Sequence, residues 1–282
     1  MTRQQKKALK MALSYLVIIL IGCLLLFPIA WMISCAFKTN EEIFGSIALL
    51  PKSFSFQNFV DGWKSAGSYT YLTYFLNSFA LVMPTTVLTI ASSALVAYGF
   101  ARFEFPFKKQ LFALLIATLM LPNSVIIIPR YVLFNKFGWV DSYMPWWVPA
   151  ILACYPFFIY QLIQFMRSIP RDLDESAYID GCSTFRVFWQ ILLPLMKSSL
   201  FSAGLFQFLW TYNDYFNSLI FINSVKKYTV SLALRLSVDA ESVVVWGRVM
   251  AMACVAVLPL VLLFFAAQKY FVEGIATSGL KG

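Results

Sequence analysis

Long runs of apolar residues, with at most one charged residue in each, set the strongest limit on what this chain can fold into. Each of six runs is long enough to cross the ~30 Å hydrocarbon core of a bilayer as a helix, which takes about 20 residues. The chain is therefore predicted to be an all-α, polytopic membrane protein with six transmembrane helices. We expect these helices over the ranges Met11–Phe37, Tyr69–Phe100, Leu111–Ile128, Pro145–Met166, Ser199–Phe221 and Val243–Gln268.

The composition separates the chain from soluble proteins of its size. Apolar residues make up 60% of it and charged residues 12%, whereas a soluble domain has about 45–50% and about 25%. A formal net charge of +9 would suit nucleic acid in a soluble protein. In a membrane protein, basic residues instead hold loops beside anionic lipid on the cytoplasmic side. We therefore expect contact with membrane lipid and no nucleic acid partner.

The basic residues also predict how the helices are oriented. Arg3, Lys6, Lys7 and Lys10 precede the first run, which is too long for a cleaved signal peptide and lacks an A-x-A site. With the N-terminus inside, thirteen Lys and Arg residues fall on inside segments and eight on outside loops. By the positive-inside rule, both termini and the segment between the fourth and fifth runs are expected to face the cytoplasm.

Residue types that carry catalysis or hold a cofactor are sparse in the sequence. There is no histidine, and the five cysteines are scattered without C-x-x-C spacing, which removes the commonest general base and the usual zinc and disulfide patterns. The chain also has no G-x-x-x-x-G-K-[ST] motif for ATP. We therefore expect no enzymatic activity, no catalytic residue, no metal and no cofactor on this chain.

The stretch DESAYIDGCSTFRVFWQILLPL is the one charged and irregular segment in the C-terminal half. Carboxylates cluster where a helix would begin, which suits the positive end of its dipole. Gly181 falls where a helix C-terminus favours a left-handed residue. Ser183 can then cap a second helix, whose apolar residues recur at helical spacing as far as Pro194. The sequence therefore predicts a helix-turn-helix on the cytoplasmic side.

Two interpretations of this helix-turn-helix are open. An amphipathic loop can simply lie on lipid. However, the first helix begins with Asp172, Asp174 and Glu175, a poor choice beside an anionic leaflet. Ala177 and Gly181 would form a small surface flanked by these carboxylates, and we expect that surface to be exposed and to dock into a groove of another protein.

Part of this loop resembles a known motif. Glu175-Ser176-Ala177-x-x-Asp180-Gly181, followed by Ile191-x-Leu193-Pro194, resembles the "EAA" loop of permease subunits from binding-protein-dependent ABC importers. The resemblance covers nearly the whole chain and is most specific to six-span carbohydrate-uptake permeases of the maltose type. Trp210–Phe216 and the tail from Gln268 to Gly282 are similar to further segments of that family. Ser176 and Ser198 depart from its usual alanine and proline.

The resemblance implies a mechanical role within a larger assembly. It assigns coupling to separate ATPase subunits to Glu175, Ala177, Asp180, Gly181, Ile191, Leu193 and Pro194. It implies as partners a second permease, two ABC ATPase subunits that bind ATP, and an extracytoplasmic substrate-binding protein. The substrate would be a carbohydrate, in particular an oligosaccharide, crossing the cytoplasmic (inner) membrane of a bacterium. Residues 1–282 would form one transmembrane domain, with a core bundle at about 69–268 and a cytoplasmic coupling loop at 167–198.

Polar residues within the apolar runs are candidates for the translocation pathway: Asn123, Asn213, Asp214 and Asn217. A charge such as Asp214 costs about 2.5–3.5 kcal/mol at the centre of a membrane helix. The alternative is that Asp214 pairs with Arg248 or lies near the outer end of its helix. Thr85, Thr89 and Ser92 form a stripe that suits helix packing better than a pore.

Three other functions remain open at this stage. The same subfamily design would serve a permease for glycerol phosphate. An ion-coupled secondary carrier would have Asp214 as its only plausible coupling acid, and a membrane enzyme would lack the residues for its chemistry.

Overall fold

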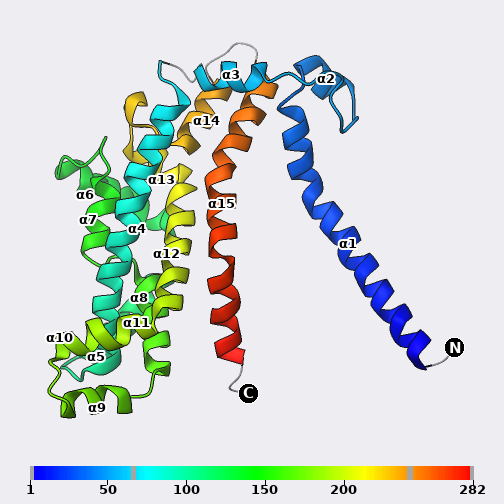
Figure 1. Cartoon of the computed structure of the whole chain (residues 1–282). Coiled ribbons are helices and arrows are strands. Elements are labelled where there is room, and N and C mark those ends of the chain that lie inside the picture. The colour runs from blue at the N-terminus through cyan, green and yellow to red at the C-terminus, as the bar shows by residue number, and fades with distance from the viewer. Residues whose placement is uncertain (1–2, 65–67, 240–243, 280–282) are drawn as a thin grey trace. The chain divides into compact units, whose positions relative to one another are not determined.

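The computed structural model describes residues 3–64, 68–239 and 244–279, and these residues form helices joined by turns and loops, without a β-strand (Figure 1). The all-helical membrane architecture predicted from the apolar runs is confirmed. The chain divides into two compact units, Met1–Tyr71 with Ala233–Leu258 (unit 1), and Leu72–Leu232 with Pro259–Gly282 (unit 2).

Within the described residues, four stretches of helix are long and apolar enough to cross a membrane. They are Lys10–Cys35 in α1 (Arg3–Cys35), α4 (Tyr71–Arg102), Met144–Ser168, and Trp246–Gln268 in α15 (Trp246–Gly279). The third of them contains α7 (Met144–Ile151) and α8 (Pro156–Ser168). Two further pairs of helices pass the same test only as bent spans, which gives up to six in all.

The third predicted span is wrong as a straight helix. Instead of one helix over Leu111–Ile128, α5 (Lys108–Leu119) and α6 (Asn123–Lys136) meet at a bend of 103°. Pro122 stands at the bend with ψ near 141°. Proline has no amide hydrogen to donate and disfavours helical geometry in the residue before it, so a helix cannot run straight through this point.

The fifth predicted span, Ser199–Phe221, is broken as well. Helix α12 (Lys197–Tyr212) ends before Asn213, and a separate helix α13 (Tyr215–Phe221) follows. The Asp214 carboxylate accepts a hydrogen bond from the amide of Asn217 at 3.1 Å and so caps α13. Asp and Asn compete for backbone partners inside a helix and favour such caps. The short helix α14 (Val230–Asp239) was not predicted, because a search for long uncharged runs passes over it.

In unit 1, two short helices, α2 (Asn40–Gly45) and α3 (Gln57–Lys64), are fixed against the start of α15. The Asn40 side chain donates to Val244 O at 2.6 Å and accepts from the amide of Trp246 at 2.8 Å. A Cβ at Gly247 would lie 2.5 Å from Lys38 O, so no larger residue fits at this close approach. Unit 1 therefore has a well-packed end around these helices.

In unit 2, the core forms where α4 packs against α8 and the segment that follows it. Figure 1 shows α9 at one end of this unit and α6 and α7 toward the other, with α4 running between them. Thr85 and Thr89 on α4 are fully buried, and Ser92 donates to Ala150 O at 2.6 Å. The polar stripe of α4 is therefore a helix-packing surface, as the sequence favoured.

Asp141 organises the loops at the end of unit 2 opposite α9. Its carboxylate accepts hydrogen bonds from the amides of Asn223 and Ser224 at 3.0 and 2.8 Å, from the Ser224 hydroxyl at 2.6 Å, and from Lys227 Nζ at 3.0 Å. Burial acts to raise the pKa of Asp141, but the hydrogen bonds from Ser224 and Lys227 outweigh it and hold the pKa below its ordinary value. The ionised form is therefore the one that ties these loops together.

We predict that Asp141→Asn lowers the free energy of unfolding by about 2 kcal/mol near neutral pH, since it removes charge-assisted hydrogen bonds. A carboxyl with a depressed pKa stabilises the fold above its ordinary pKa, and this contribution is lost as the pH falls through the folded-state pKa. The difference in the midpoint temperature of unfolding between wild type and variant, measured in detergent, should therefore become smaller as the pH is lowered. The exposed Glu41→Gln serves as the control, and an Asp141→Asn gap that stays constant with pH would contradict this assignment.

Candidate functional site

The loop between α8 and α12 has the predicted helix-turn-helix form. It consists of α9 (Asp172–Ile179), α10 (Thr184–Arg186), the π-helix η1 (Val187–Leu192) and α11 (Leu193–Leu195), and the chain then bends by 76° into α12. Gly181 has φ of +79°, and the Ser183 hydroxyl accepts from the amide of Arg186 at 3.4 Å. The turn residue and the cap are therefore confirmed.

The π-helical stretch was not predicted from the sequence. In this register the amide of Leu193 donates to Phe188 O, five residues earlier. The register ends beside Pro194, which has no amide to donate, and the chain bends after Met196. The spacing of apolar residues could not show this wider turn, because six residues are too few to tell hydrogen bonds to the fourth preceding residue from bonds to the fifth.

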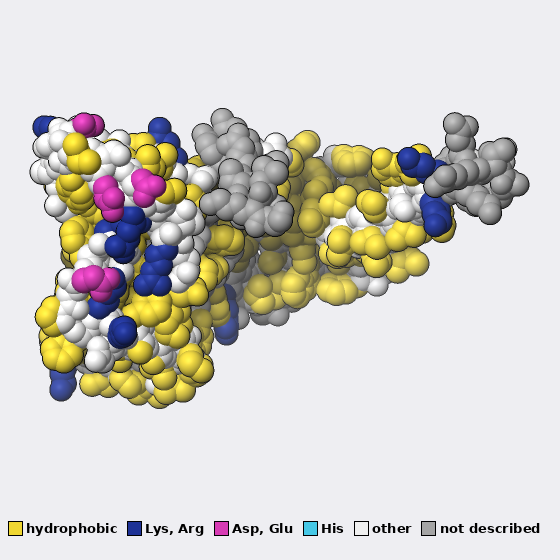
Figure 2. Space-filling model, turned by 90° about the horizontal axis from the view of Figure 1, so that it is seen from below, with side chains coloured by type: hydrophobic (Ala, Val, Ile, Leu, Met, Phe, Trp, Pro, Cys, Tyr) yellow, Lys and Arg dark blue, Asp and Glu magenta, His cyan; other side chains and the backbone are white. Residues whose placement is uncertain are grey.

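The orientation of α9 corrects one expectation. Ala177 was expected to lie on an exposed small surface, but it is only 5% exposed and packs into the core of unit 2 beside Val187 and Phe188. The face of α9 turned outward instead carries Ile179, which is 87% exposed, together with exposed carboxylates. Figure 2, which views this end of the molecule, shows acidic and basic side chains side by side with hydrophobic ones. The surface available to a partner is therefore apolar and acidic.

The remaining residues of the predicted coupling motif divide into two groups. Ile191 and Leu193 are partly buried and pack against the core of unit 2. Glu175, Asp180, Gly181 and Pro194 are exposed. The structure thus brings all of them into one compact loop, in which the first group holds the shape and the second is open to contact.

A buried ion pair joins α9 to the end of α4. Arg102 Nε lies 2.7 Å from Asp174 Oδ2, and the two side chains are 6% and 9% exposed. Arg102 also donates to Ile169 O at 3.1 Å, and Arg171 donates back to Ala101 O at 3.3 Å. Burial raises the pKa of the Asp174 carboxyl, and the charges of Arg102 and Arg171 oppose this shift. The ends of α4 and α9 are therefore joined both by contacts from Arg102 of α4 and by a hydrogen bond that Arg171 returns to α4.

A second connection ties α4 to the other half of the loop. The Tyr98 hydroxyl donates to Thr184 O at 3.0 Å, and its ring stacks on Phe188 with centroids 4.9 Å apart. Sequence reasoning missed both Arg102 and Tyr98, because their partners lie far along the chain. The basic and aromatic residues at the very end of the second apolar run were the only signal. These contacts fix the second half of the loop to α4.

The pathway candidates lie in two places. Trp146 Nε1 donates to Asp214 Oδ2 at 3.1 Å, and Asn217 Nδ2 donates to both carboxylate oxygens at 2.8 and 3.0 Å. Asn213 is exposed beside them at the break between α12 and α13. Asn123, at the start of α6, accepts instead from Arg130 at 3.2 Å. The structure therefore groups three of the four candidates and separates Asn123 from them.

Asp214 and Arg248 lie in different units, and each has partners within its own unit. Arg248 forms its ion pair with Asp61 at 3.6 Å. Asp214 is stabilised by the cap of α13 and by hydrogen bonds from Trp146 and Asn217. Its charge therefore has a structural explanation at a helix break.

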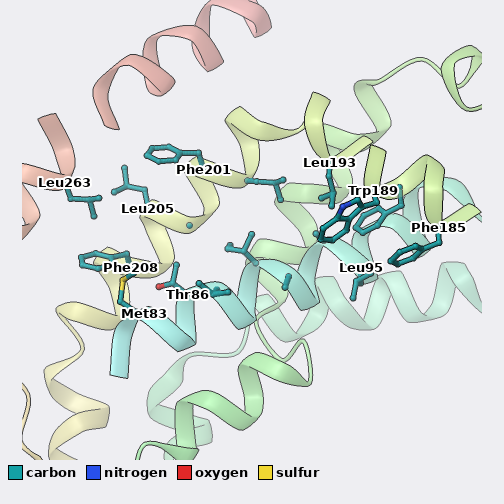
Figure 3. A pocket seen from close by; sticks show the side chains of 17 residues that line it. Met83, Thr86, Leu95, Phe185, Trp189, Leu193, Phe201, Leu205, Phe208 and Leu263 are labelled. Atoms are coloured by element: carbon teal, nitrogen blue, oxygen red, sulfur yellow. The ribbon is translucent and has the colours of Figure 1, made fainter. Parts of the chain in front are cut away.

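Unit 2 also contains an apolar cavity of about 670 Å³ (Figure 3). It lies between α4, α10 with η1, α12 and α15, and Met83, Phe201, Phe208 and Leu263 are among the side chains that point into it. Thr86 supplies the only hydroxyl in its lining. A polyol that loses its water here would leave hydroxyl groups without hydrogen bonds. This cavity is therefore unsuited to hold a sugar, and none of the pathway candidates lines it.

Comparisons with known proteins agree with this arrangement. The family model described as "Binding-protein-dependent transport system inner membrane component" matches residues 90–277. The trehalose/maltose transport system permease protein MalG of Thermococcus litoralis is 30% identical over 99% of each chain. The arabinooligosaccharides transport system permease protein AraQ of Bacillus subtilis is 30% identical over 93% of each.

Among solved structures, a chain from a bacterial ABC transporter involved in the import of the acidic polysaccharide alginate has a similar fold. The TM-score is 0.82 at 16% sequence identity, over 96% of this chain and 99% of that one. At this identity the likeness concerns the fold.

We predict that the two charges of the buried pair depend on each other. Arg102→Leu or Asp174→Leu alone should lower the free energy of unfolding by about 3–5 kcal/mol, since each leaves a buried charge without its partner. The double variant should lose much less free energy of unfolding than the two single variants lose together. A double-mutant cycle on thermal unfolding in detergent measures this, and additive losses would show that the pair does not hold α9 to α4.

We also predict that Gly181 is required for its backbone conformation and not for space. No atom lies within 4 Å of a Cβ placed there, but φ is +79°. Gly181→Asn should therefore be tolerated, whereas Gly181→Val should cost about 1–2 kcal/mol, because a β-branched residue resists this conformation. Proteolysis within the loop and thermal unfolding measure the difference, and equal effects of the two variants would contradict the prediction.

Proposed function

Because the chain belongs to the family of binding-protein-dependent transport system inner membrane components, we propose that it is the permease subunit through which an ABC importer moves a carbohydrate. The observation that carries this proposal is the loop of residues 167–198. Its outer face is open to a partner, while buried contacts fix its inner side to α4. Such a loop can pass movement from a partner subunit into the membrane helices.

The energy comes from elsewhere in the assembly. The sequence has no phosphate-binding loop for ATP, so we place ATP on two separate ATPase subunits. Within the loop, Glu175 and Asp180 stand on the contact surface, together with the exposed Ile179. Ala177, Ile191 and Leu193 act from behind that surface, where they pack the loop on unit 2.

Gly181 and Pro194 shape the same loop. Gly181 takes the left-handed conformation at the turn. Pro194 lies in α11, between the end of the π-helix and the start of α12. Both are exposed, and their contribution to coupling is to fix the angle between the two short helices.

A carbohydrate substrate is supported by the relatives. One is described as a transporter of trehalose and maltose and another as a transporter of arabinooligosaccharides, and we therefore favour an oligosaccharide. The exposed amides of Asn123 and Asn213 are suited to contact hydroxyl groups along the pathway, while Asp214 and Asn217 shape the break between α12 and α13. An ion-coupled carrier is disfavoured, because hydrogen bonds hold Asp214 as a helix cap.

The rest of the proposal concerns assembly and orientation. Residues 1–282 form one transmembrane domain in the inner membrane of a bacterium, with its core at about 69–268. The loop and both termini face the cytoplasm, as the distribution of basic residues favours. The partners are a second permease, the two ATPase subunits and an extracytoplasmic substrate-binding protein.

We predict that Ile179→Asp weakens the hold on the ATPase subunits. Ile179 is 87% exposed in this chain, so the substitution should not disturb folding, but docking would bury its new carboxylate without a partner. The ATPase subunits recovered with the tagged chain should fall by at least about tenfold, and so should ATP hydrolysis stimulated by the binding protein and an oligosaccharide. The second permease should be retained.

The matched control is Ile47→Asp. Ile47 is 96% exposed and lies after α2, on a loop predicted to face outward, so the same substitution there should leave ATPase recovery unchanged. Full recovery and full stimulation with Ile179→Asp would contradict the assignment of α9 as the docking element.

A further inference from the structure

A polar pocket of about 390 Å³ lies beside the loop at the α9 end of unit 2. It forms where α4 and α8 end and where α5 begins, so it is bordered by the ends of three apolar helices. Its lining is mainly polar, in contrast to the apolar cavity deeper in the unit. We call it the basic pocket because of the side chains that line it, Arg102, Lys108, Arg167 and Arg171 against the single carboxylate of Glu104.

The ion pairs of the pocket neutralise only two of its four positive charges. Arg102 is paired with Asp174 at 2.7 Å, and Lys108 with the exposed Glu104 at 2.9 Å. Within the described parts of the chain, Arg167 and Arg171 have no carboxylate partner in an ion pair. The lining of the basic pocket therefore carries an excess of two positive charges.

The contacts of these two arginines leave their guanidinium groups able to bind more. Arg167 lies 5.1 Å from the centre of the Phe112 ring, and Arg171 donates to Ala101 O at 3.3 Å. Both side chains are exposed. The hydrogen bond from Lys108, with the charges of Lys108, Arg171 and Lys109, lowers the pKa of Glu104. The surroundings of the pocket thus favour negative charge.

We propose that the basic pocket binds a phosphate group, carried either by the headgroup of an anionic phospholipid or by a small soluble anion. Two guanidinium groups offer the planar, paired donors that match phosphate oxygens. The floor is preformed, because Arg102 is 6% exposed and fixed by Asp174 and Ile169. The pocket lies at the ends of membrane-spanning helices, the level at which phospholipid headgroups meet basic residues.

Binding is measured on the full chain, purified in detergent with its partner subunits and stripped of lipid. Three probes are titrated and followed by native mass spectrometry: dioctanoyl-phosphatidylglycerol, dioctanoylglycerol with the same acyl chains and no phosphate, and inorganic phosphate. Phosphatidylglycerol should bind and dioctanoylglycerol should not. Displacement of the lipid by inorganic phosphate would identify a soluble phosphate as a possible source, whereas lipid binding that phosphate does not displace would identify the headgroup.

The double variant Arg167→Gln/Arg171→Gln should weaken phosphatidylglycerol binding by at least about tenfold, the loss of one charge-assisted contact or more. The variant Arg167→Lys/Arg171→Lys keeps the charge and loses the paired geometry of the donors. Its affinity for phosphatidylglycerol should lie between that of the glutamine variant and that of wild type. The control Lys136→Gln/Lys226→Gln removes the same charge from exposed positions elsewhere and should bind as wild type does.

The proposal is overturned by any of three results. The first is equal binding by wild type and the arginine variant, and the second is equal binding of the two lipids. The third is loss of the ATPase subunits from the arginine variant with lipid binding intact, which would show that the pocket serves a protein partner.

Discussion

The buried pair of Arg102 and Asp174 is the interaction on which the loop at the α9 end depends. A charge out of water is costly unless its partner is close and other hydrogen bonds complete its shell. Here the two groups are 2.7 Å apart and Arg102 also donates to Ile169 O, but Asp174 Oδ1 is buried without a hydrogen-bond partner among the described residues. Because either charge alone would be strongly unfavourable, α9 and the end of α4 must stay together. The ion pair therefore fixes the position of the loop relative to α4.

In the proposed function, this constraint gives the permease a mechanical role. The family is one of membrane transport components and not of enzymes. To that role the chain would bring the exposed face of α9, a second attachment of the loop through Tyr98 and Thr184, and helices broken at defined points. The breaks have identifiable causes, a proline at Pro122 and a capping carboxylate at Asp214.

Much of the fold could be predicted from the sequence, since the bilayer imposes it on any chain with such apolar runs. Local rules also placed the turn at Gly181 and the cap at Ser183. The direction that Ala177 faces could not be predicted, because it depends on packing against residues of other elements. The partner of Arg102 could not be predicted from the sequence for the same reason. Local sequence determines where a helix ends, whereas burial is decided by the whole unit.

We propose that ATP hydrolysed on partner subunits drives movement of substrate through this chain. The most direct test is uptake of a labelled oligosaccharide by proteoliposomes that contain the assembled transporter, with the binding protein outside and ATP inside. We expect uptake that requires ATP and the binding protein and that continues when an ionophore collapses the ion gradients. Uptake that proceeds without ATP and stops when the gradients collapse would contradict it.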